Sequence, residues 1–304
     1  MKIAGVSMTY NDEYKLKEWG EHFEEYKKEL DYYVIVDNGS SHSYVQKLES
    51  TFPEAAIIRR NSNGGCTAAY NDGIRYILKN TDADAIVLIA NDFKLCKGCL
   101  TGLYKFLCSD KKLGLVSSAV LVKDSMQVES YGHIVNNYKI IECDKGRDID
   151  KLLPKYKFTD LVAGGFYMAK REFYEEVGLQ DEKLFMYGDE LDTAIRTKRA
   201  GYKLGVTCEV YGWHWHINEP NRKTRKPASN YLIARNRVYV VRKYYGIGSV
   251  ILTFCRFSIL LPIRLLIAGI IKMETGRIER AVYYFWGGVN GLIGNMEPNK
   301  YTIF

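Results

Sequence analysis

The chain has 304 residues, of which 47% are hydrophobic and 26% are charged, and this composition excludes an intrinsically disordered protein. The length is sufficient for a large core and predicts one large domain, or two half-domains that share a sheet. The 43 basic and 36 acidic residues leave a formal net charge of +7, a modest excess whose distribution matters more than its size.

The first 95 residues alternate short apolar runs with helical stretches. We expect strands at 3–8, 33–36, 56–58 and 85–90, and helices at 13–30 and 67–79. This alternation implies crossover connections and a mostly parallel sheet. In such sheets ligands bind beyond the carboxyl ends of the strands, so the polar residues found there are the first candidates for function.

Polar clusters follow three of these strands, and a glycine pair precedes the second helix. The clusters are Thr9-Tyr10-Asn11, Asp37-Asn38-Gly39-Ser40, Asn91-Asp92 and Asn63-Gly64-Gly65. Paired glycines let a backbone approach a ligand closely, and a helix N-terminus favours phosphate. Each cluster alone is typical of an ordinary turn. Their joint placement after successive strands predicts a ligand site.

The middle of the chain, 114–212, predicts mixed strand and helix and contains a dense acidic stretch at 181–192. If Asp189 opens a helix, its carboxylate and that of Glu190 suit the helix cap and dipole, which is a purely structural role.

The seven cysteines are odd in number and scattered, and the N-terminus runs directly into a strand-like segment. We therefore expect free thiols in a reducing compartment. Cys96 and Cys99 form a C-x-x-C, but no second pair follows at zinc-finger spacing, so ordinary buried thiols are favoured.

A boundary is expected at 218–227, and a basic run without acidic residues begins within it. Its members are Arg222, Lys223, Arg225, Lys226, Arg235, Arg237, Arg242 and Lys243. The run favours a phosphate-bearing or membrane partner, with a solvated helix face as the alternative.

The segment 247–271 is strongly apolar but contains Arg256, Pro262 and Arg264, which disfavour a membrane-spanning helix. We expect helices here and at 282–293 that lie on the membrane surface. Packing on the catalytic domain, dimerisation and a true span remain alternatives.

The ordered motifs resemble the family 2 glycosyltransferases of GT-A type, especially bacterial rhamnosyl- and galactofuranosyltransferases. The matching residues are the four clusters above with Ala69, Asn71 and Gly73, then Gly164-Gly165, the acidic stretch 181–192, Arg196, Gly201-Tyr202, His214, His216 and Arg235-Asn236. Any one motif is weak, whereas the ordered set is specific.

The resemblance implies an α/β fold with a Rossmann-like mixed sheet flanked by helices and a C-terminal helical tail. It implies a GT-A catalytic domain at 1–220, with a nucleotide-binding half at 1–95 and an acceptor half at 96–220, and a helical region at 221–304 that associates with a membrane or dimerises. The expected activity is inverting, metal-dependent transfer of a sugar from a UDP- or dTDP-sugar to a glycan or lipid-linked glycan in cell-surface polysaccharide synthesis.

The resemblance also assigns nucleotide and metal residues. Asp37 would accept the imide hydrogen of uracil or thymine, Thr9 and Asn11 would line the nucleoside pocket, and Asn63 and Gly65 would lie near the nucleotide and sugar. Asn91-Asp92 aligns with the end of the family's D-x-D metal motif, whose first acidic position here is Ala90.

That departure leaves Asp92 as the motif's carboxylate and weakens the prediction of strict metal dependence. His214 or His216 would be a further ligand of Mn²⁺ or Mg²⁺, since imidazole suits Mn²⁺ whereas Mg²⁺ prefers oxygen. An aromatic cluster with the flanking tryptophans is the alternative.

The remaining assignments concern catalysis and the acceptor. The pair Asp189-Glu190 falls at the family's catalytic base, and Glu190 occupies the usual base position. Gly164, Gly165 and Asp181 would lie beside the acceptor. Direct displacement by the acceptor hydroxyl inverts the anomeric configuration.

The predicted location is cytoplasmic, on the inner face of the cell membrane, and a homodimer is an open possibility. The rival interpretations are an inactive nucleotide- or sugar-binding scaffold, encouraged by Ala90, and a nucleotidyltransferase. The second lacks its Arg/Lys-bearing glycine loop after the first strand. A dehydrogenase lacks G-x-G-x-x-G at that point, and nucleic acid is not an expected partner.

Overall fold

The computed structural model describes residues 1–136, 139–152, 154–215 and 227–297. The chain divides into two compact units, the first comprising Met1–Gln180 and Thr193–Pro220 and the second comprising Asp181–Asp192 and Asn221–Phe304. The acidic stretch thus belongs with the C-terminal helices, although it lies inside the 1–220 range expected for the catalytic domain.

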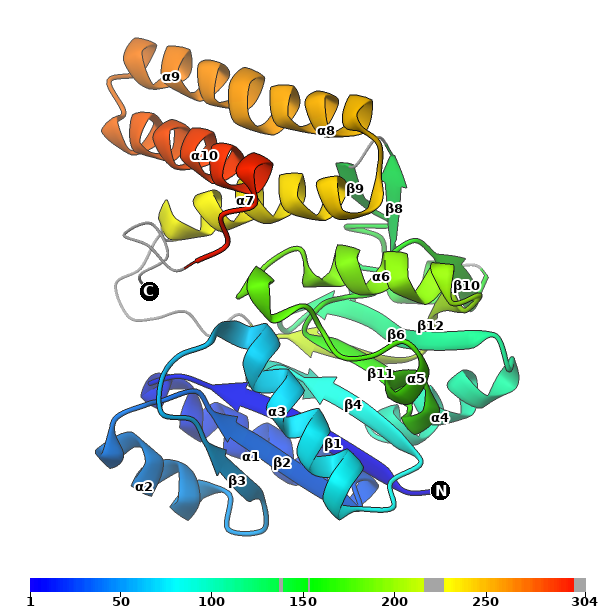
Figure 1. Ribbon diagram of the computed structural model, residues 1–304. Coiled ribbons are helices and arrows are strands. Elements are labelled where there is room, and N and C mark those ends of the chain that lie inside the picture. Colours follow the sequence, from blue (N-terminus) through cyan, green and yellow to red (C-terminus); the bar gives the residue numbers. More distant parts are fainter. Residues whose placement is uncertain (137–138, 153, 216–226, 298–304) are drawn as a thin grey trace. The chain divides into compact units, whose positions relative to one another are not determined.

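The first unit is built on a ten-stranded sheet within the described ranges (Figure 1). The strand order is β10-β12-β6-β11-β4-β1-β2-β3, with β5 beside β12 and β7 beside β6. The strands are β1 Ile3–Thr9, β2 Tyr32–Asp37, β3 Ala56–Arg59, β4 Ala85–Ile89, β5 Phe93–Leu95, β6 Leu113–Val122, β7 Val128–Ser130, β10 Tyr156–Thr159, β11 Phe166–Lys170 and β12 Lys203–His214. A separate pair, β8 His133–Asn136 and β9 Lys139–Glu142, forms a small antiparallel sheet.

Strands β1 to β4 are mutually parallel where they pair, and β11 runs antiparallel to both β4 and β6. The mixed sheet is therefore the predicted one. Thr9 pairs in register with Asp37, so the carboxyl ends of β1 and β2 meet at one edge. This edge collects the polar clusters.

Helices cover both faces of the sheet because successive strand residues point to opposite faces. They are α1 Leu16–Tyr26, α2 His42–Thr51, α3 Gly65–Asn80, α4 Cys99–Ser109 and α5 Arg171–Glu176. Helix α6, Asp189–Arg199, begins in the second unit and ends in the first. Helix α3 lies so close to β1 that a Cβ atom on Gly73 would come within 2.4 Å of Val6 Cγ1. On the opposite face of the sheet, helices α1, α2 and α4 contribute Trp19, Tyr44 and Leu103 to one hydrophobic core, which they share with side chains of the strands.

Most of the predicted elements are present with small shifts of their ends. The stretch expected as one helix at 13–30 is α1 flanked by 3₁₀ turns at Glu13–Lys15 and Lys27–Glu29. Helix α2 is absent from the predicted set. It is a short helix capped by Ser41, whose hydroxyl accepts a hydrogen bond from the Tyr44 N–H.

The second unit contains the C-terminal helices. They are α7 Pro227–Tyr244, α8 Ile247–Phe254, the π-helical segment Cys255–Leu260, α9 Leu261–Ile271 and α10 Thr275–Ile293. Two glycines let α10 lie directly on the backbone of α7. A Cβ atom on Gly287 or Gly291 would stand 2.2 Å from the carbonyl oxygen of Tyr231 or Arg235, respectively. Only glycine permits this approach.

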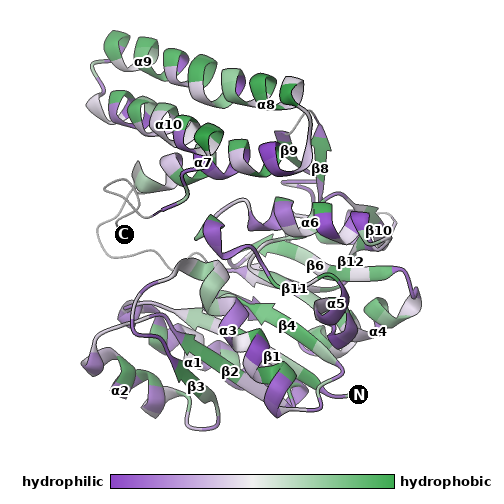
Figure 2. Ribbon diagram, viewed as in Figure 1, coloured by the Kyte–Doolittle hydropathy of each residue, from purple (hydrophilic) through white to green (hydrophobic). Residues whose placement is uncertain are grey.

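The α8–α9 segment is strongly apolar and largely exposed. Ile247–Ile271 is a 25-residue helix that is long and apolar enough to cross a membrane by length and composition, and 22% of its most apolar window is buried. Figure 2 shows the hydrophobic colouring running along α8 and α9.

Candidate active site

Two of the predicted nucleotide-binding residues, Thr9 and Asp37, lie fully buried at the carboxyl ends of β1 and β2. The hydroxyl of Thr9 is hydrogen-bonded to that of Tyr44. Asp37 Oδ1 accepts the Ser40 N–H at 3.1 Å, while Arg59 Nε lies 3.6 Å from Asp37 Oδ2. In this structure Asp37 braces the loop after β2, and Thr9 ties the end of β1 to helix α2.

Asn11 joins the loops that follow β1 and β2. Its backbone has a positive φ of 50°, which asparagine tolerates better than most residues. Its N–H donates to Ser40 Oγ at 2.9 Å, and its Oδ1 accepts the Ser41 N–H at 3.0 Å. The two loops therefore form one connected surface at the sheet edge.

A network of amide side chains closes the glycine loop. Asn38 Nδ2 donates to Asn63 Oδ1 at 2.9 Å and to the Gly65 carbonyl at 3.0 Å. In return, Asn38 Oδ1 accepts the Gly64 N–H and Asn63 Oδ1 accepts the Gly65 N–H. Two N–H groups that the start of α3 would offer to a phosphate are thus engaged by side chains. Asn38 has this bracing role in addition to the predicted residues.

Asp92 and His214 are brought together at the end of β4. Strand β12 pairs with β5 so that His214 faces Phe93, and the Trp215 N–H donates to the Asp92 carbonyl at 2.7 Å. His214 Nε2 lies 3.6 Å from Asp92 Oδ1. The second predicted histidine, His216, lies outside the described residues.

Lys15 occupies the other side of the Asp92 carboxylate. Its Nζ lies 3.2 Å from Asp92 Oδ2 and donates to Asn91 Oδ1 at 2.9 Å, while Asp12 Oδ2 lies 3.9 Å away. Burial opposes ionisation of Asp92, but His214 and Lys15 outweigh it and hold the pKa of Asp92 well below its ordinary value. Lys15 was not predicted as a site residue.

His214 is held between two carboxylates. Its Nδ1 lies 3.5 Å from Glu129 Oε2, and its ring stacks on Phe93 with centroids 4.8 Å apart. Burial disfavours the imidazolium, but Asp92 and Glu129 outweigh burial and raise the pKa of His214 to about 9. The aromatic partner of His214 is thus Phe93 rather than a flanking tryptophan.

The donor set fits a divalent cation with two protein ligands. Asp92 Oδ1 and His214 Nε2, 3.6 Å apart, would be the two protein atoms that hold such a cation. Among the described residues no group of three or more His, Cys, Asp or Glu side chains is arranged to hold a metal. A diphosphate and water would complete the shell, the arrangement that Mg²⁺ commonly adopts.

Ala90 does not contribute a ligand, and its side chain packs on the core beneath the sheet edge. A Cβ atom on Gly165 would lie 3.2 Å from the Ala90 Cβ, and the Gly165 carbonyl accepts the Ala90 N–H at 2.8 Å. Gly164 and Gly165 therefore line the end of β4, in the loop that leads into β11.

The predicted catalytic pair lies at the start of α6, in the second unit. Burial, followed by repulsion from Glu190 and Asp192, raises the pKa of Asp189 well above its ordinary value. Glu190 is half-buried, and its Oε2 accepts the Gly188 N–H at 3.2 Å. Because the raised pKa of Asp189 favours its neutral form and Glu190 is the less buried of the two, Glu190 is the better candidate for a base.

The Arg235-Asn236 pair of α7 holds the turn before α6. Asn236 Nδ2 donates to the carbonyls of Leu184, Met186 and Tyr187 at 2.7–2.9 Å. Phe185 and Tyr187 in this turn have positive φ values of 64° and 67°, which are uncommon outside glycine. The sequence had marked Asn236 as a motif residue without a role, and the structure makes it a clamp on this strained turn.

Asp181, predicted at the acceptor, is engaged within the second unit. Its Oδ2 lies 2.7 Å from Lys243 Nζ and accepts from the Tyr239 hydroxyl at 3.1 Å. The same Lys243 donates to the fully buried Asp192 at 2.9 Å. The sequence predicted Lys243 only as a member of the basic run. The run gives no indication that Lys243 neutralises the carboxylates of Asp181 and Asp192.

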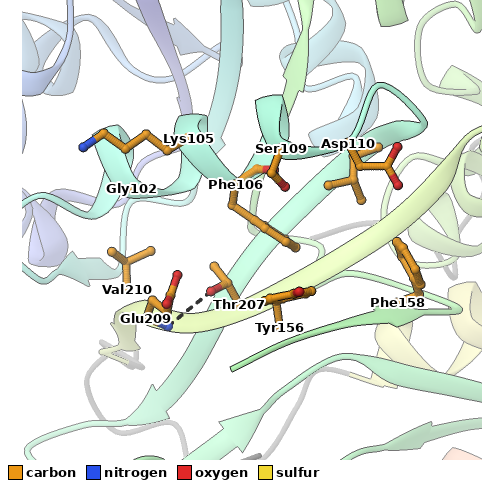
Figure 3. Close-up of a pocket in the computed structure, with 11 residues that line it drawn as sticks. Gly102, Lys105, Phe106, Ser109, Asp110, Tyr156, Phe158, Thr207, Glu209 and Val210 are labelled. Atoms are coloured by element: carbon orange, nitrogen blue, oxygen red, sulfur yellow. Dashed lines mark hydrogen bonds between the residues drawn. The ribbon is translucent and has the colours of Figure 1, made fainter. Parts of the chain in front are cut away.

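A separate cavity of about 560 Å³ lies in the first unit between α4, β10 and β12. Figure 3 shows Phe106 of α4 and Tyr156 of β10 directed into this space. Its lining, as far as the chain is described, contains none of the predicted site residues. The cavity is distinct from the strand-end edge.

Comparisons with known proteins give matches to glycosyltransferases. The profile described as "Glycosyl transferase family 2" matches residues 6–178. The low-salt glycan biosynthesis hexosyltransferase Agl10 of Haloferax volcanii is 22% identical over 271 residues, 87% of this chain and 85% of that protein. The dTDP-rhamnosyl transferase RfbF of Shigella flexneri is 24% identical over 247 residues, 79% and 80% of the two chains.

A solved structure supports the fold. GalNAc-T7, crystallised with UDP, GalNAc and Mn²⁺, superposes with a TM-score of 0.63 at 13% sequence identity. The match covers 97% of this chain and 56% of GalNAc-T7, so this chain spans little more than half of that protein. The predicted GT-A fold, a mixed sheet flanked by helices with C-terminal helices, is confirmed. With more than half of its length matching the profile, the chain belongs to glycosyl transferase family 2 and is a glycosyltransferase of glycan biosynthesis.

Proposed function

We propose that this glycosyltransferase moves a sugar from a UDP- or dTDP-sugar to a glycan or lipid-linked glycan, with Mn²⁺ or Mg²⁺ and with inversion at the anomeric carbon. The observation that carries the proposal is the approach of His214 Nε2 to Asp92 Oδ1, 3.6 Å apart at the strand edge that also holds Asp37. The name of RfbF specifies a dTDP-rhamnosyl donor, and the GalNAc-T7 crystal contains UDP and Mn²⁺, which supports this donor class and cation.

For the nucleotide, Asp37 offers Oδ2 as the acceptor for the base imide. Arg59 lies against this oxygen, and its side chain is 46% exposed, so that it can swing away when a base enters. Thr9, Asn11, Asn63 and Gly65 act by holding the loops that flank the nucleotide. Their hydrogen bonds supply the rigid first layer that precise binding needs.

For the diphosphate, Asp92 and His214 would hold the cation, with His216 as the further candidate ligand. The cation would neutralise the charge that develops on the departing diphosphate. The protein's own contribution is to present one carboxylate oxygen and one imidazole nitrogen to the same point.

For the transfer step, Glu190 takes the proton of the acceptor hydroxyl. The hydroxyl oxygen then forms the new bond to the anomeric carbon while the bond to the diphosphate breaks. Because no enzyme nucleophile intervenes, this single displacement inverts the configuration. Burial raises the pKa of Asp189 and favours its neutral form, so Asp189 is the weaker competitor for the role of base. We assign Gly164, Gly165 and Asp181 to the acceptor side, with residues 1–95 binding nucleotide, 96–220 the acceptor and 221–304 the membrane.

Calorimetric titration with UDP and dTDP, each with and without Mn²⁺, tests this proposal. Wild-type protein should bind one nucleotide more tightly with Mn²⁺. Asp92→Asn should remove the metal dependence, and Asp37→Asn should weaken binding with or without metal. Asp110→Asn, whose carboxylate lines the separate cavity, is the matched control and should behave as wild type. Folded wild-type protein that binds neither nucleotide would favour an inactive scaffold instead.

We also propose that the α8–α9 segment lies on the cytoplasmic face of the membrane, where a lipid-linked acceptor would be presented. Its outward stripe includes Ile263, Ile267, Ile270 and Ile271, which are 46–75% exposed. Transfer of each such side chain out of water gains about 1–2 kcal/mol. Arg256 and Arg264 interrupt the segment and suit an in-plane helix, because long basic side chains can reach lipid headgroups.

Flotation with vesicles containing anionic lipid tests the membrane proposal. The Ile267→Asp/Ile271→Asp double variant should float far less than wild type. The control, Ile134→Asp/Ile141→Asp, places the same charges at exposed isoleucines of β8–β9 and should float normally. Release of wild-type protein from membranes by alkaline carbonate would agree with surface attachment, whereas retention would indicate a span. Dimers that dissociate in the α9 variant without lipid would indicate an oligomer interface.

A further inference from the structure

Glu129 approaches the imidazole of His214 on the side away from Asp92. It is carried by β7, which pairs with β6, the strand that also runs beside β12 and His214. Glu129 Oε2 lies 3.5 Å from His214 Nδ1, while Nε2 of the same ring lies 3.6 Å from Asp92 Oδ1. The two carboxylates therefore flank opposite nitrogens of one ring.

This arrangement rules out one role for Glu129 and favours another. Because the ring separates its carboxylate from that of Asp92, Glu129 cannot share a cation held between Asp92 and Nε2. A carboxylate that accepts the second N–H of a metal-binding histidine fixes the tautomer and ring orientation. When a cation displaces the proton from Nε2, this carboxylate keeps the remaining proton on Nδ1 and so turns Nε2 toward the cation.

The proposed metal site has few protein ligands, so the orientation of His214 matters for its affinity. Ala90 removes one carboxylate from the motif, and no set of three ligands occurs among the described residues. Phe93 stacks on one face of the imidazole and restricts the ring to a plane, but stacking does not decide which nitrogen faces Asp92. Among the described contacts of His214, that choice falls to Glu129.

We propose that Glu129 is a positioning residue that acts through His214 to set the affinity of this enzyme for its divalent cation. The inference rests on the proposed metal site. Glu129 touches neither the nucleotide-sugar nor the cation, and its carboxylate orients the histidine that does bind the cation. A Gln at this position keeps the shape and one acceptor oxygen but loses the charge, so it isolates the electrostatic part of the effect.

The test measures Mn²⁺ binding rather than turnover. Free Mn²⁺ is followed by its EPR signal as protein is titrated, first alone and then with UDP or dTDP. Glu129→Gln should weaken Mn²⁺ binding by about 10-fold, the lower end of the range for such outer carboxylates. Glu142→Gln, an exposed carboxylate of β9 paired with Lys145, is the matched control and should leave the affinity unchanged.

A double-mutant comparison separates positioning from a general loss of structure. In a His214→Ala background, Glu129→Gln should cause no further loss, because the residue through which it acts is gone. Pulsed EPR supplies a second readout, since a bound imidazole imprints its nitrogen modulation on the Mn²⁺ echo. That modulation should be present in wild type, reduced in Glu129→Gln and weakest in His214→Ala, where His216 is the one remaining candidate imidazole ligand. Thermal unfolding monitored by circular dichroism verifies that each variant is folded.

The outcomes distinguish failure of the Glu129 positioning role from failure of the proposed metal site. Wild-type affinity and modulation in folded Glu129→Gln would overturn the positioning role while leaving the metal site intact. A loss that persists undiminished in the His214→Ala background would also overturn it. Wild-type protein that binds no Mn²⁺ with or without nucleotide would overturn the metal site and, with it, this inference.

Discussion

The ammonium group of Lys15 lies 3.2 Å from Oδ2 of Asp92, while Oδ1 of the same carboxylate lies 3.6 Å from His214 Nε2. Each oxygen of Asp92 thus faces a different partner. Lys15 would leave Oδ1 as the oxygen for the proposed cation, and its positive charge lies at the edge where we propose that the diphosphate binds.

Replacing Lys15 should have opposite effects on the cation and on the nucleotide. In Lys15→Met the repulsion between the ammonium and a divalent cation disappears, so Mn²⁺ should bind the protein alone more tightly. The same change removes a positive charge from the diphosphate, so UDP or dTDP should bind about 10-fold more weakly. Calorimetry with each ligand measures both effects. A variant that binds both ligands more weakly would show that Lys15 mainly maintains the loop.

Glu190 and Asp189 should differ sharply in their contribution to turnover. Loss of a general base lowers the rate by about 10²–10⁴-fold, and we expect this for Glu190→Gln with nucleotide binding retained. Asp189→Asn should cost much less, because burial already favours its protonated form. Donor turnover with an acceptor glycan, measured as released nucleoside diphosphate, makes the comparison. A larger loss for Asp189→Asn would exchange the two roles.

Gly39 should tolerate substitution less well than another glycine with similar backbone geometry. Gly39 has a φ of +87°, and a Cβ atom there would lie 2.7 Å from Ser62 Cα, so the loop between Asp37 and Asn63 would have to shift. We expect Gly39→Ala to lower the free energy of unfolding by about 2–3 kcal/mol and to weaken nucleotide binding. Gly98→Ala is the control, since φ is +75° but a Cβ atom would meet nothing within 4 Å. Equal losses in urea unfolding would mean that positive φ, and not the close approach, limits both sites.

Lys243 should stabilise the second unit over a defined pH window. Lys243→Met leaves the fully buried Asp192 without its cation, and we expect a loss of about 2–4 kcal/mol at neutral pH. Burial opposes ionisation of Asp181, but Lys243 outweighs it and lowers the pKa of that carboxyl. Asp181 and Asp192 in turn outweigh burial and raise the pKa of Lys243.

The sign of the pH dependence follows from these two shifts. A lowered folded pKa makes the Asp181 contribution present above its unfolded value of about 4 and lost as pH falls through the folded value. A raised folded pKa makes the Lys243 contribution present below about 10 and lost above the folded value. The difference between wild type and Lys243→Met should therefore be largest between about pH 5 and 10 and shrink below about pH 4. Urea unfolding across this range measures it, and a constant difference at low pH would contradict the pairing.

Gly287 should be indispensable for the packing of α10 on α7. A Cβ atom at this position would stand 2.2 Å from the Tyr231 carbonyl oxygen, which is backbone and cannot rotate away. Gly287→Ala should therefore lower the free energy of unfolding by about 3 kcal/mol or more. Gly276→Ala in the same helix meets nothing within 4 Å and should be neutral or stabilising by up to about 1 kcal/mol. Equal effects of the two substitutions would contradict the close contact.

The strand-end clusters could be predicted because their signals are local. Apolar alternation located β1, β2 and β4, and a parallel sheet must then bring Thr9-Asn11, Asp37-Ser40 and Asn91-Asp92 to one edge. The start of α6 at Asp189 was equally accessible, since acidic residues favour a helix N-terminus. Helix α2 was missed because a short helix between two turn motifs presents little periodicity.

Sequence by itself therefore determined the fold family, the polar strand-end edge and the place of the acidic pair at a helix start, because each depends on patterns within a few residues or on an ordered set of motifs. Only the tertiary structure decided what those residues contact. The pairing of β12 with β5 brings His214 to Asp92, and β7 brings Glu129 to the far side of the ring. Lys243 likewise meets Asp192 only through the packing of α7. Such contacts join residues tens to more than a hundred positions apart, and the free energy that selects them comes from burial and charge neutralisation in the folded chain, which leave no local period to detect.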